Sequence, residues 1–300
     1  MELRILTYFL TVVKEESFSK AAEQLFITQP TLSRQIMELE KELGISLFHR
    51  GKKNRKVLLT EQGIYFKRRA EEIISLTERT KAEFSASAAD TAVSGDVYIG
   101  GGETAAMSII AKAISFLQKK YPHIVVHIFS GNADDVAEKL DKGLLDFGIF
   151  VEPASKEKYH YMNLPAADIW GLLMLNNSPL AQKQYISSHD IEKIPLIISK
   201  QTMVTNLLAG WYGKSVDNLH IVADYNLIFN ASLLVKEGIG YALCLDKLAA
   251  VDENSGFVFV PLKPELKASC SIVWKKHVRF TKAAETFLEE LRLLLIKNKQ

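Results

Sequence analysis

The 300-residue chain lacks the features that typify exported and membrane proteins. It has only two cysteines, Cys244 and Cys270, whose spacing suits neither a zinc site nor a disulfide framework, so we expect a reducing compartment, the cytoplasm. No run reaches the ~18 apolar residues of a membrane span, and we expect no membrane partner. The apolar stretch from Ile5 to Val13 has acidic residues on both sides and no small-residue cleavage site. It therefore predicts a buried helix rather than a signal peptide.

Net charge is also small, at +2, so the chain as a whole is no polycation. The first 60 residues carry ten Lys and Arg against seven Asp and Glu, so they hold +3 and the other 240 residues sum to −1. Attraction to nucleic acid is therefore confined to the first fifth of the chain. The length predicts two or three domains, and an apolar fraction of 48% is that of a globular protein.

Three helices are predicted within the first 44 residues. The first covers residues 2–15. The second starts near Phe18 and repeats small or apolar residues at i, i+3, i+4 and i+7, with one of two nearby serines as its cap. After a tight gap, the third begins at the N-cap Thr28 and stops at Gly44. Two short helices joined by a tight turn form a helix-turn-helix, at about residues 18–37, whose second helix enters the DNA major groove.

The third helix has two unlike faces. Leu32, Ile36, Leu39 and Leu43 form an apolar face at helical spacing. The polar residues at its start suit the edges of bases, because Gln pairs with adenine, Arg with guanine, and Ser or Thr with several bases. The candidate DNA contacts on this helix are Thr28, Gln29, Pro30, Thr31, Ser33 and Arg34. The alternative is an ordinary amphipathic helix with a solvated polar face.

A basic hairpin is predicted next. Residues 47–63, LFHRGKKNRKVLLTEQG, indicate strand, turn and strand. Beside a helix-turn-helix, such a hairpin is a wing that follows phosphates and the minor groove, whereas the alternative is a solvated charged loop. The basic residues are Arg50, Lys52, Lys53, Arg55 and Lys56, of which the first four join the candidate DNA contacts.

This spacing of residues resembles that of the LysR-type transcriptional regulators over residues 2–65. The positions that carry the resemblance are Phe18, Ala21, Ala22, Leu25, Thr28, Gln29, Pro30, Leu32, Ser33, Arg34, Ile36, Leu39, Glu40, Leu43, Gly44, Leu47, Phe48, Arg50, Thr60 and Gly63. The resemblance implies a winged helix-turn-helix DNA-binding domain at residues 1–60, followed by a small-molecule sensor. Its implied partners are double-stranded DNA with a two-fold-related operator, a small-molecule effector, further copies of the chain as a homodimer or homotetramer, and RNA polymerase.

A long helix is predicted over residues 61–88, capped by Thr60. Its residues Phe66, Ala70, Ile73, Thr77, Thr80 and Phe84 recur at spacings of four and three, which is a weak coiled-coil seam. We expect this linker helix to dimerise, and the alternative is a helix lying against its own chain. The small, polar residues 89–95 predict a hinge.

Residues 96–300 alternate between strands and helices. Strands at DVYIG, HIVVHIF and LLDFGIFV, with helices at 104–120 and 132–143, predict a parallel βαβαβ unit. A second set runs from WGLLMLN through PLIIS, LHIVAD, a helix at 226–237 and GYALCL, and then CSIVWKK and a helix at 281–297 return to the first set. The pattern resembles the two-lobed periplasmic-binding-protein (type 2) fold of the family's effector domain. Lobe I is expected at about 96–165 and 269–300, and lobe II at about 166–268. The predicted fold class is α/β with an N-terminal winged helix-turn-helix.

An effector is expected at the carboxyl ends of the strands, where open α/β sheets bind ligands. The candidate effector-binding residues are Gly102, Glu103, Thr104, Ser130, Gly131, Val151, Glu152, Gln201, Thr202, Asp224 and Tyr225. Glu103 would repel an anion, whereas Glu152 and Asp224 would attract an amine. The alternative for Glu103 and Asp224 is a helix-capping role, so the chemistry of the effector stays open.

The rival hypothesis is a dinucleotide-dependent oxidoreductase. The GGGETA loop at 100–105 fits the glycine fingerprint between a strand and a helix. That fingerprint needs an acidic residue about 20 positions on, yet residues 104–133 contain no Asp or Glu. The seven histidines are dispersed, and no nucleophile has a recognisable base. We therefore expect no enzyme, no cofactor and no metal site, and a sequence-specific regulator whose DNA binding responds to an effector between the lobes.

Overall fold

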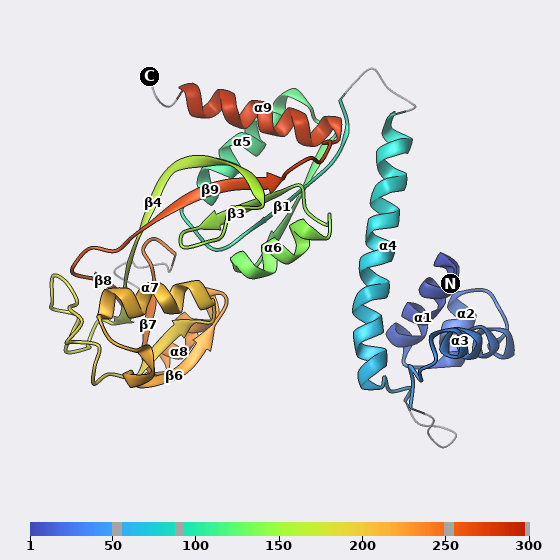
Figure 1. Ribbon diagram of the computed structural model, residues 1–300, viewed down its shortest axis with the longest axis horizontal. Helices are drawn as coiled ribbons and strands as arrows, with labels where there is room; N and C mark the ends of the chain where they lie inside the picture. Colours follow the sequence, from blue (N-terminus) through green and yellow to red (C-terminus); the bar gives the residue numbers. More distant parts are fainter. Residues whose placement is uncertain (50–55, 88–92, 249–254, 298–300) are drawn as a thin grey trace. The chain divides into compact units, whose positions relative to one another are not determined.

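The structure is a computed structural model, and it describes residues 1–49, 56–87, 93–248 and 255–297. The chain divides into two compact units, Met1–Ala88 and Ala89–Gln300 (Figure 1). In the described ranges, no helix combines the length and the apolar character that crossing a membrane requires.

Three short helices form the N-terminal unit: α1 (Leu3–Glu15), α2 (Phe18–Gln24) and α3 (Gln29–Leu43). The side-chain oxygen of Thr28 accepts a hydrogen bond from the backbone N–H of Thr31 and so caps α3, and Ser17 caps α2 in the same way. Helix α3 ends at Gly44, whose φ of 69° is the left-handed conformation that glycine adopts freely. The three predicted helices are confirmed, and so are the cap and stop of α3.

An aromatic cluster holds these helices together. The Phe9 ring lies 5.3 Å from that of Phe48 and 5.0 Å from that of Phe66, measured between ring centroids. Leu32 and Ile36 of α3 are buried in the same core. The apolar face of α3 is therefore fixed inward, which leaves its opposite face to solvent.

The predicted hairpin is only partly described. Phe48 and Leu59 form one antiparallel bridge, and the N–H of His49 donates to the carbonyl of Leu58 at 2.8 Å. The two expected strands thus shorten to a single bridge within the described residues. The predicted DNA contacts Arg50, Lys52, Lys53 and Arg55 lie outside the described residues.

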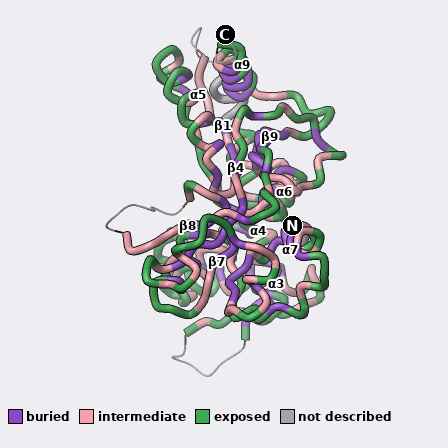
Figure 2. Tube along the Cα trace, turned by 90° about the vertical axis from the view of Figure 1, so that its left-hand side faces the viewer, coloured by how far each residue is buried: buried purple, intermediate pink, exposed green. Residues whose placement is uncertain are grey.

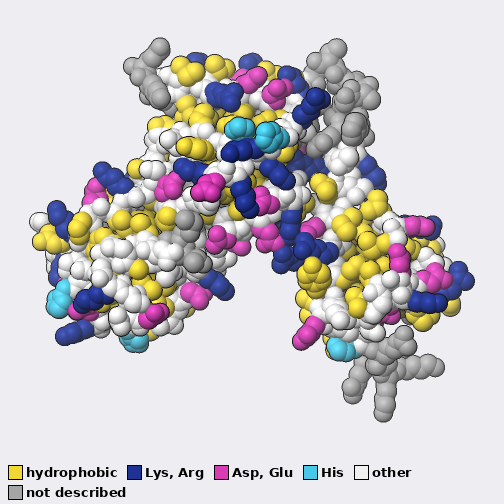
Figure 3. Space-filling model, viewed as in Figure 1, with side chains coloured by type: hydrophobic (Ala, Val, Ile, Leu, Met, Phe, Trp, Pro, Cys, Tyr) yellow, Lys and Arg dark blue, Asp and Glu magenta, His cyan; other side chains and the backbone are white. Residues whose placement is uncertain are grey.

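The linker helix is α4 (Glu61–Ser87), and the hydroxyl of Thr60 accepts from the N–H of Gly63 at its start. The predicted seam is wrong at its first two positions, because Phe66 and Ala70 are buried in the core of their own unit. Apolar residues exposed on α4 are Ile64, Tyr65, Ile73 and Leu76. Hydrophobic side chains along α4 and α1 are visible at the surface in Figure 3.

The second unit is a mixed sheet with helices on both faces (Figure 1). Its described strands follow the order β2-β1-β3-β9-β4-β7-β5-β6, and β8 pairs with β4. The strands are β1 (Gly95–Gly101), β2 (Ile124–Ser130), β3 (Phe147–Val151), β4 (Tyr159–Leu175), β5 (Leu196–Ser199), β6 (Ile221–Tyr225), β7 (Tyr241–Leu245), β8 (Phe257–Pro261) and β9 (Lys267–Lys275). The helices are α5 (Met107–Lys120), α6 (Ala133–Asp141), α7 (Thr202–Tyr212), α8 (Ile228–Lys236) and α9 (Lys282–Lys297), with a short 3-10 helix at Val216–Asn218.

Two lobes share this sheet. Strand β1 pairs in parallel with β2 and β3 in lobe I, and β5 pairs in parallel with β6 and β7 in lobe II. Strands β4 and β9 pair with each other and run between the lobes, so the chain crosses between them twice. The parallel βαβαβ unit and the two-lobed fold class are confirmed.

Several boundaries differ from the expectation. Strand β4 begins at Tyr159, eleven residues before the predicted strand at Trp170, because it crosses both lobes. Helix α5 starts at Met107 rather than at residue 104, because the hydroxyl of Thr104 turns inward to a buried partner. The sequence pattern does not predict helix α7 or strand β8.

Each lobe has its own core. Ile110 of α5 and Phe287 of α9 pack on Ile99 and Phe147 of the lobe I sheet, whereas Leu172 lies in the separate core of lobe II. Figure 2 shows that the buried residues follow the strands and the inward side of α9. The apolar side chains of each lobe therefore pack mainly within that lobe.

Substitution of Gly63 tests how closely α4 approaches the base of the hairpin. A Cβ at this position would lie 2.0 Å from the carbonyl oxygen of Leu47. We expect Gly63→Ala to lower the free energy of unfolding of the N-terminal unit by about 1–3 kcal/mol, measured by thermal or urea unfolding. The matched control is Gly210→Ala on α7, where a Cβ meets nothing within 4 Å and should be neutral or stabilise by about 1 kcal/mol. Equal effects of the two substitutions would contradict this account.

Candidate DNA-reading surface and effector cavity

The start of α3 presents the predicted contact residues outward. Thr28, Gln29, Pro30, Thr31 and Arg34 are exposed, and Ser33 is half-buried. The hydroxyls of Thr28 and Thr31 lie 2.8 Å apart and hydrogen-bond to each other. The guanidinium of Arg34 lies 3.6 Å from the carboxylate of Glu38, with both side chains exposed. Such a surface ion pair is weak and exchanges readily for a phosphate or a base edge.

The hairpin is fixed to α3 by a carboxylate. Glu40 of α3 accepts hydrogen bonds from the N–H groups of Leu47 at 2.6 Å and Phe48 at 3.2 Å. At the other end, the ammonium of Lys56 lies 2.5 Å from Glu16, and this hydrogen bond raises the pKa of Lys56. The N–H of Val57 also donates to the carbonyl of Glu16 at 3.0 Å, so backbone groups at both ends of the segment that carries the basic turn are bonded to the helical core.

Phe26 is a residue that sequence reasoning missed. It stands two positions before the N-cap Thr28, has a φ of 56°, and is 95% exposed. A bulky residue in the left-handed region and a bare aromatic ring are both unfavourable in isolation. The signal in the sequence was an aromatic residue in a tight turn, where Gly or Asn would be ordinary.

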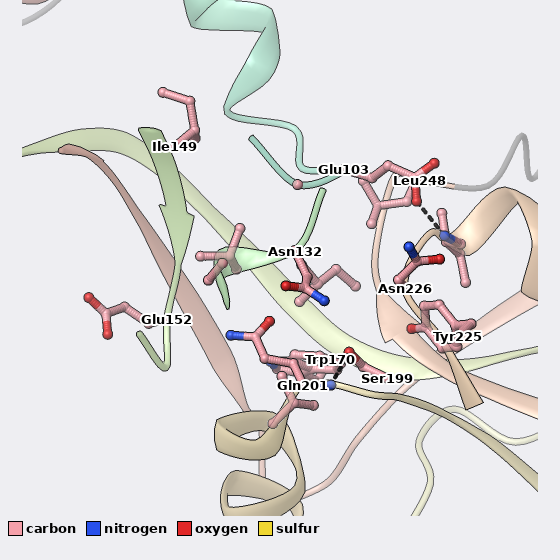
Figure 4. Close-up of a pocket in the computed structure, with 16 residues that line it drawn as sticks. Glu103, Asn132, Ile149, Glu152, Trp170, Ser199, Gln201, Tyr225, Asn226 and Leu248 are labelled. Atoms are coloured by element: carbon pink, nitrogen blue, oxygen red, sulfur yellow. Dashed lines mark hydrogen bonds between the residues drawn. The ribbon is translucent and has the colours of Figure 1, made fainter. Parts of the chain in front are cut away.

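The second unit contains a cavity between the two lobes, with about 70 Å³ accessible to the centre of a water molecule (Figure 4). Its lining residues are Gly102, Glu103, Asn132, Ala133, Ile149, Val151, Glu152, Trp170, Ser199, Gln201, Val204, Tyr225, Asn226, Ile228, Leu245 and Leu248. They come from the carboxyl ends of strands in both lobes, which is where open α/β sheets bind ligands. Trp170 is buried on β4, and its indole Nε1 has no hydrogen-bond partner within the described part of the chain.

Two contacts join the lobes across this cavity. The carboxylate of Glu103, in lobe I, accepts a hydrogen bond from the N–H of Ile228 at the start of α8, in lobe II. The side-chain Nε2 of Gln201, in lobe II, donates to the carbonyl of Pro153 at 3.4 Å. Glu103 is therefore a helix cap, as one alternative had it, but of a helix in the opposite lobe.

The structure divides the predicted effector residues into two groups. Gly102, Glu103, Val151, Glu152, Gln201 and Tyr225 line the cavity. Thr104, Ser130, Gly131 and Asp224 do not line it. Ser130 and Asp224 are exposed on their strands, and the N–H of Gly131 is used by the carbonyl of Gly101. Nothing is described of the Thr202 side chain. The lining residues missing from the predicted set include Asn132 and Asn226, which stand at the predicted helix starts, and Trp170, at the start of a predicted strand.

Thr104 belongs to a buried cluster beneath the cavity. Its hydroxyl donates to Oδ2 of Asp168 and lies 3.2 Å from Sγ of Cys270. Asp168 is fully buried on β4, and its Oδ1 has no partner among the described residues. Burial raises the pKa of Asp168, and it raises the pKa of the Cys270 thiol to about 11. The hydroxyl of Thr104 is thus engaged in this buried cluster and does not line the cavity.

The glycine loop of the rival hypothesis is part of a packed strand. Gly100 and Gly101 belong to β1, and a Cβ at Gly100 would lie 2.5 Å from the Leu145 side chain. These two glycines therefore serve close packing of side chains on the strand, rather than a turn around a pyrophosphate.

The fold and these sites define a winged helix-turn-helix unit joined to a two-lobed ligand-binding unit. Residues 3–64 match the family model described as "Bacterial regulatory helix-turn-helix protein, lysR family", and residues 91–294 match "LysR substrate binding domain". The chain belongs to the LysR family of DNA-binding transcriptional regulators.

Curated relatives resemble the whole chain. The HTH-type transcriptional regulator BsdA of Bacillus subtilis (strain 168) is 26% identical over 309 residues, covering 96% of this chain and 99% of the relative. A hydrogen peroxide-inducible genes activator of Dickeya chrysanthemi is 27% identical over 313 residues, covering 99% and 98%. The crystal structure of CbnR with its target DNA is similar in fold, with a TM-score of 0.71, 20% identity, and coverage of 98% of this chain and 100% of that one.

The buried carboxyl of Asp168 predicts a pH-dependent stability. Its folded pKa lies above the unfolded value of about 4, so the native state binds the proton more tightly. Stability is then lost as the pH rises from about 4 through the folded pKa. We expect the melting temperature of Asp168→Asn, relative to wild type, to rise between pH 4 and pH 8, as the pH passes from the unfolded to the folded pKa of Asp168.

Asp224→Asn is the matched control, because Asp224 is exposed and its side chain forms no hydrogen bond within the described ranges. Its melting temperature should follow wild type at every pH. A constant difference between Asp168→Asn and wild type across this range would contradict the raised pKa.

Proposed function

We propose that residues 1–60 read an operator by inserting α3 into the major groove of double-stranded DNA. The observation that carries the proposal is the division of α3 into a buried face, with Leu32 and Ile36, and an exposed start. The proposed base contacts are Gln29, Ser33 and Arg34, with Thr28, Pro30 and Thr31 beside them. Arg50, Lys52, Lys53 and Arg55 of the wing would contact phosphates or the minor groove. The helix-turn-helix itself spans about residues 18–37.

Substitution of Arg34 tests whether the start of α3 recognises bases of the operator. We expect Arg34→Ala to weaken binding to the preferred operator by about 1–3 kcal/mol, or 5- to 150-fold, and to leave non-operator DNA nearly unchanged. Gel-shift titrations against both DNAs measure this difference. Arg292→Ala on α9 is the matched control, because it removes the same exposed group from the other unit.

Substitution of Lys52 and Lys53 tests whether the wing contacts the phosphates of DNA. Their replacement by alanine should weaken binding to all DNA alike, and it should reduce the salt slope by about one for each phosphate that the variant no longer binds. Unchanged binding by both this double variant and Arg34→Ala would mean that the reading surface lies elsewhere.

We further propose that α4, over residues 61–88, joins two copies of the chain, with residues 89–95 as a hinge. Tyr65, Ile73 and Leu76 lie within one 80° sector of α4, and their exposed apolar side chains support this role. A homodimer, or a homotetramer built from two such pairs, would suit a two-fold-related operator. RNA polymerase is a further partner in this proposal, and the cytoplasm is the compartment.

Substitution of Leu76 tests whether α4 forms the interface of the proposed dimer. Leu76 is 44% exposed, so Leu76→Glu should not disturb the core of its own unit. We expect it to shift the protein toward monomer by at least tenfold in dissociation constant, measured by light scattering or sedimentation. Leu293→Glu on α9, where the leucine is 50% exposed, is the control. A dimer that both variants leave unchanged would place the interface away from α4.

The proposed effector site is the cavity between the two lobes. Lobe I is proposed to comprise about residues 96–165 and 269–300, and lobe II about residues 166–268. A ligand that contacts both sides would favour one lobe arrangement, and it shifts DNA binding only if its affinity differs between arrangements. The bond from Ile228 to Glu103 offers a direct link, because one carboxylate touches both the cavity and the opposite lobe. We propose that this site binds without catalysing a reaction.

A further inference from the structure

The charged side chains that line the cavity in the described residues are all acidic. Its lining includes two carboxylates, Glu103 and Glu152. Within the described part of the chain, no Lys, Arg or His lines it. Glu152 is already paired with Lys156 at 2.5 Å, and its carboxylate points away from the other polar groups in Figure 4. Among the described residues, the Glu103 carboxylate is bonded only to the N–H of Ile228. An anionic ligand would therefore enter next to a negative charge with no cationic side chain of the described lining to oppose it.

Two of the lining amides, those of Gln201 and Asn132, have fixed orientations because each is bonded to backbone. Gln201 is 8% exposed, and since its Nε2 donates to the carbonyl of Pro153, its Oε1 is the free end. The Oδ1 of Asn132 accepts from the N–H of Asp135, so its Nδ2 is the free end. Figure 4 shows the Gln201 amide pointing toward Asn132. The cavity thus offers a buried acceptor, a carboxylate and an amide donor.

Two of the helix starts at the cavity, those of α6 and α8, already bond side chains of the protein, whereas the start of α7 at Gln201 has no side-chain cap. The start of α6 is closed by the reciprocal capping box of Asn132 and Asp135. The start of α8 is occupied by Glu103. The N–H groups of Asn132, Asp135 and Ile228 are therefore not available to an anion, although N–H groups at helix starts attract anions elsewhere.

The geometry points to an effector that carries an ammonium group and, a few bonds away, a hydrogen-bond acceptor. The ammonium group donates to the Glu103 carboxylate and to Oε1 of Gln201, and the acceptor receives a hydrogen bond from Nδ2 of Asn132. This assignment of ligand class rests on the proposed function of the cavity as the effector site. It also gives the ligand a means of control, because a cation on Glu103 binds the group that joins the two lobes.

Matched pairs of small molecules test the ligand class on the full chain. Each pair shares a skeleton and differs in the charged group: β-alaninamide against succinamate, and tyramine against 4-hydroxyphenylacetate. We expect the amine of each pair to bind at least tenfold more tightly than the carboxylate, measured by calorimetric titration and thermal shift. Tighter binding of the carboxylates, or binding of neither member of either pair, would overturn the assignment.

Glu103→Gln tests the site, because glutamine keeps an acceptor for the Ile228 N–H while it removes the charge. It should weaken the binding of the amines at least tenfold, and Gln201→Met should weaken it three- to tenfold. Glu157→Gln, an exposed acid outside the cavity, is the control. Unchanged amine affinity in Glu103→Gln would overturn the site. Operator binding by the ligand-free protein is measured in parallel, so a failure of the regulator proposal is distinguishable from a failure of the ligand assignment.

Discussion

The burial of one face of α3 is the constraint on which the rest of the N-terminal unit depends. Leu32 and Ile36 are anchored in a core that also holds Phe9 of α1 and Phe66 of α4. The same core therefore sets the direction of the polar start of α3, the position of the hairpin base and the exit of the linker helix. Each buried side chain of this kind contributes about 1.5–3 kcal/mol, far more than any exposed ion pair on the reading surface. Orientation here is a consequence of packing and not of the polar residues themselves.

The second unit has separate apolar cores on either side of a crossing that carries buried polar groups. Each lobe has its own apolar core, whereas the crossings on β4 and β9 carry polar groups that a single continuous core would exclude. Asp168 and Trp170 lie two residues apart on β4, so their side chains share one face of the strand, and each has a buried atom without a partner in the described ranges. Unsatisfied polar groups cost free energy when they are buried, so these two atoms at the crossing destabilise the fold of the second unit.

Local signals were enough to predict the helix-turn-helix, and long-range packing explains what they left out. Thr28 and Gly44 fix the ends of α3 through contacts within a few residues, so the sequence alone locates them. Phe66 fits a dimer seam equally well by spacing, and only the approach of Phe9 shows that it belongs to its own core. The cavity residue Trp170 was missed for the same reason, because the folding of the two lobes, and not its neighbours in the sequence, brings this position of β4 to the cavity.

Photocrosslinking from α3 tests the central claim, that the exposed start of this helix faces DNA bases while its leucines are held in the core. A photoreactive residue in place of Gln29 lies at that start, whereas one in place of Lys41 is equally exposed near the other end of the same helix. The account predicts strong crosslinks from position 29 to bases of the operator and few from position 41. Equal yields at the two positions, or a higher yield from position 41, would contradict it.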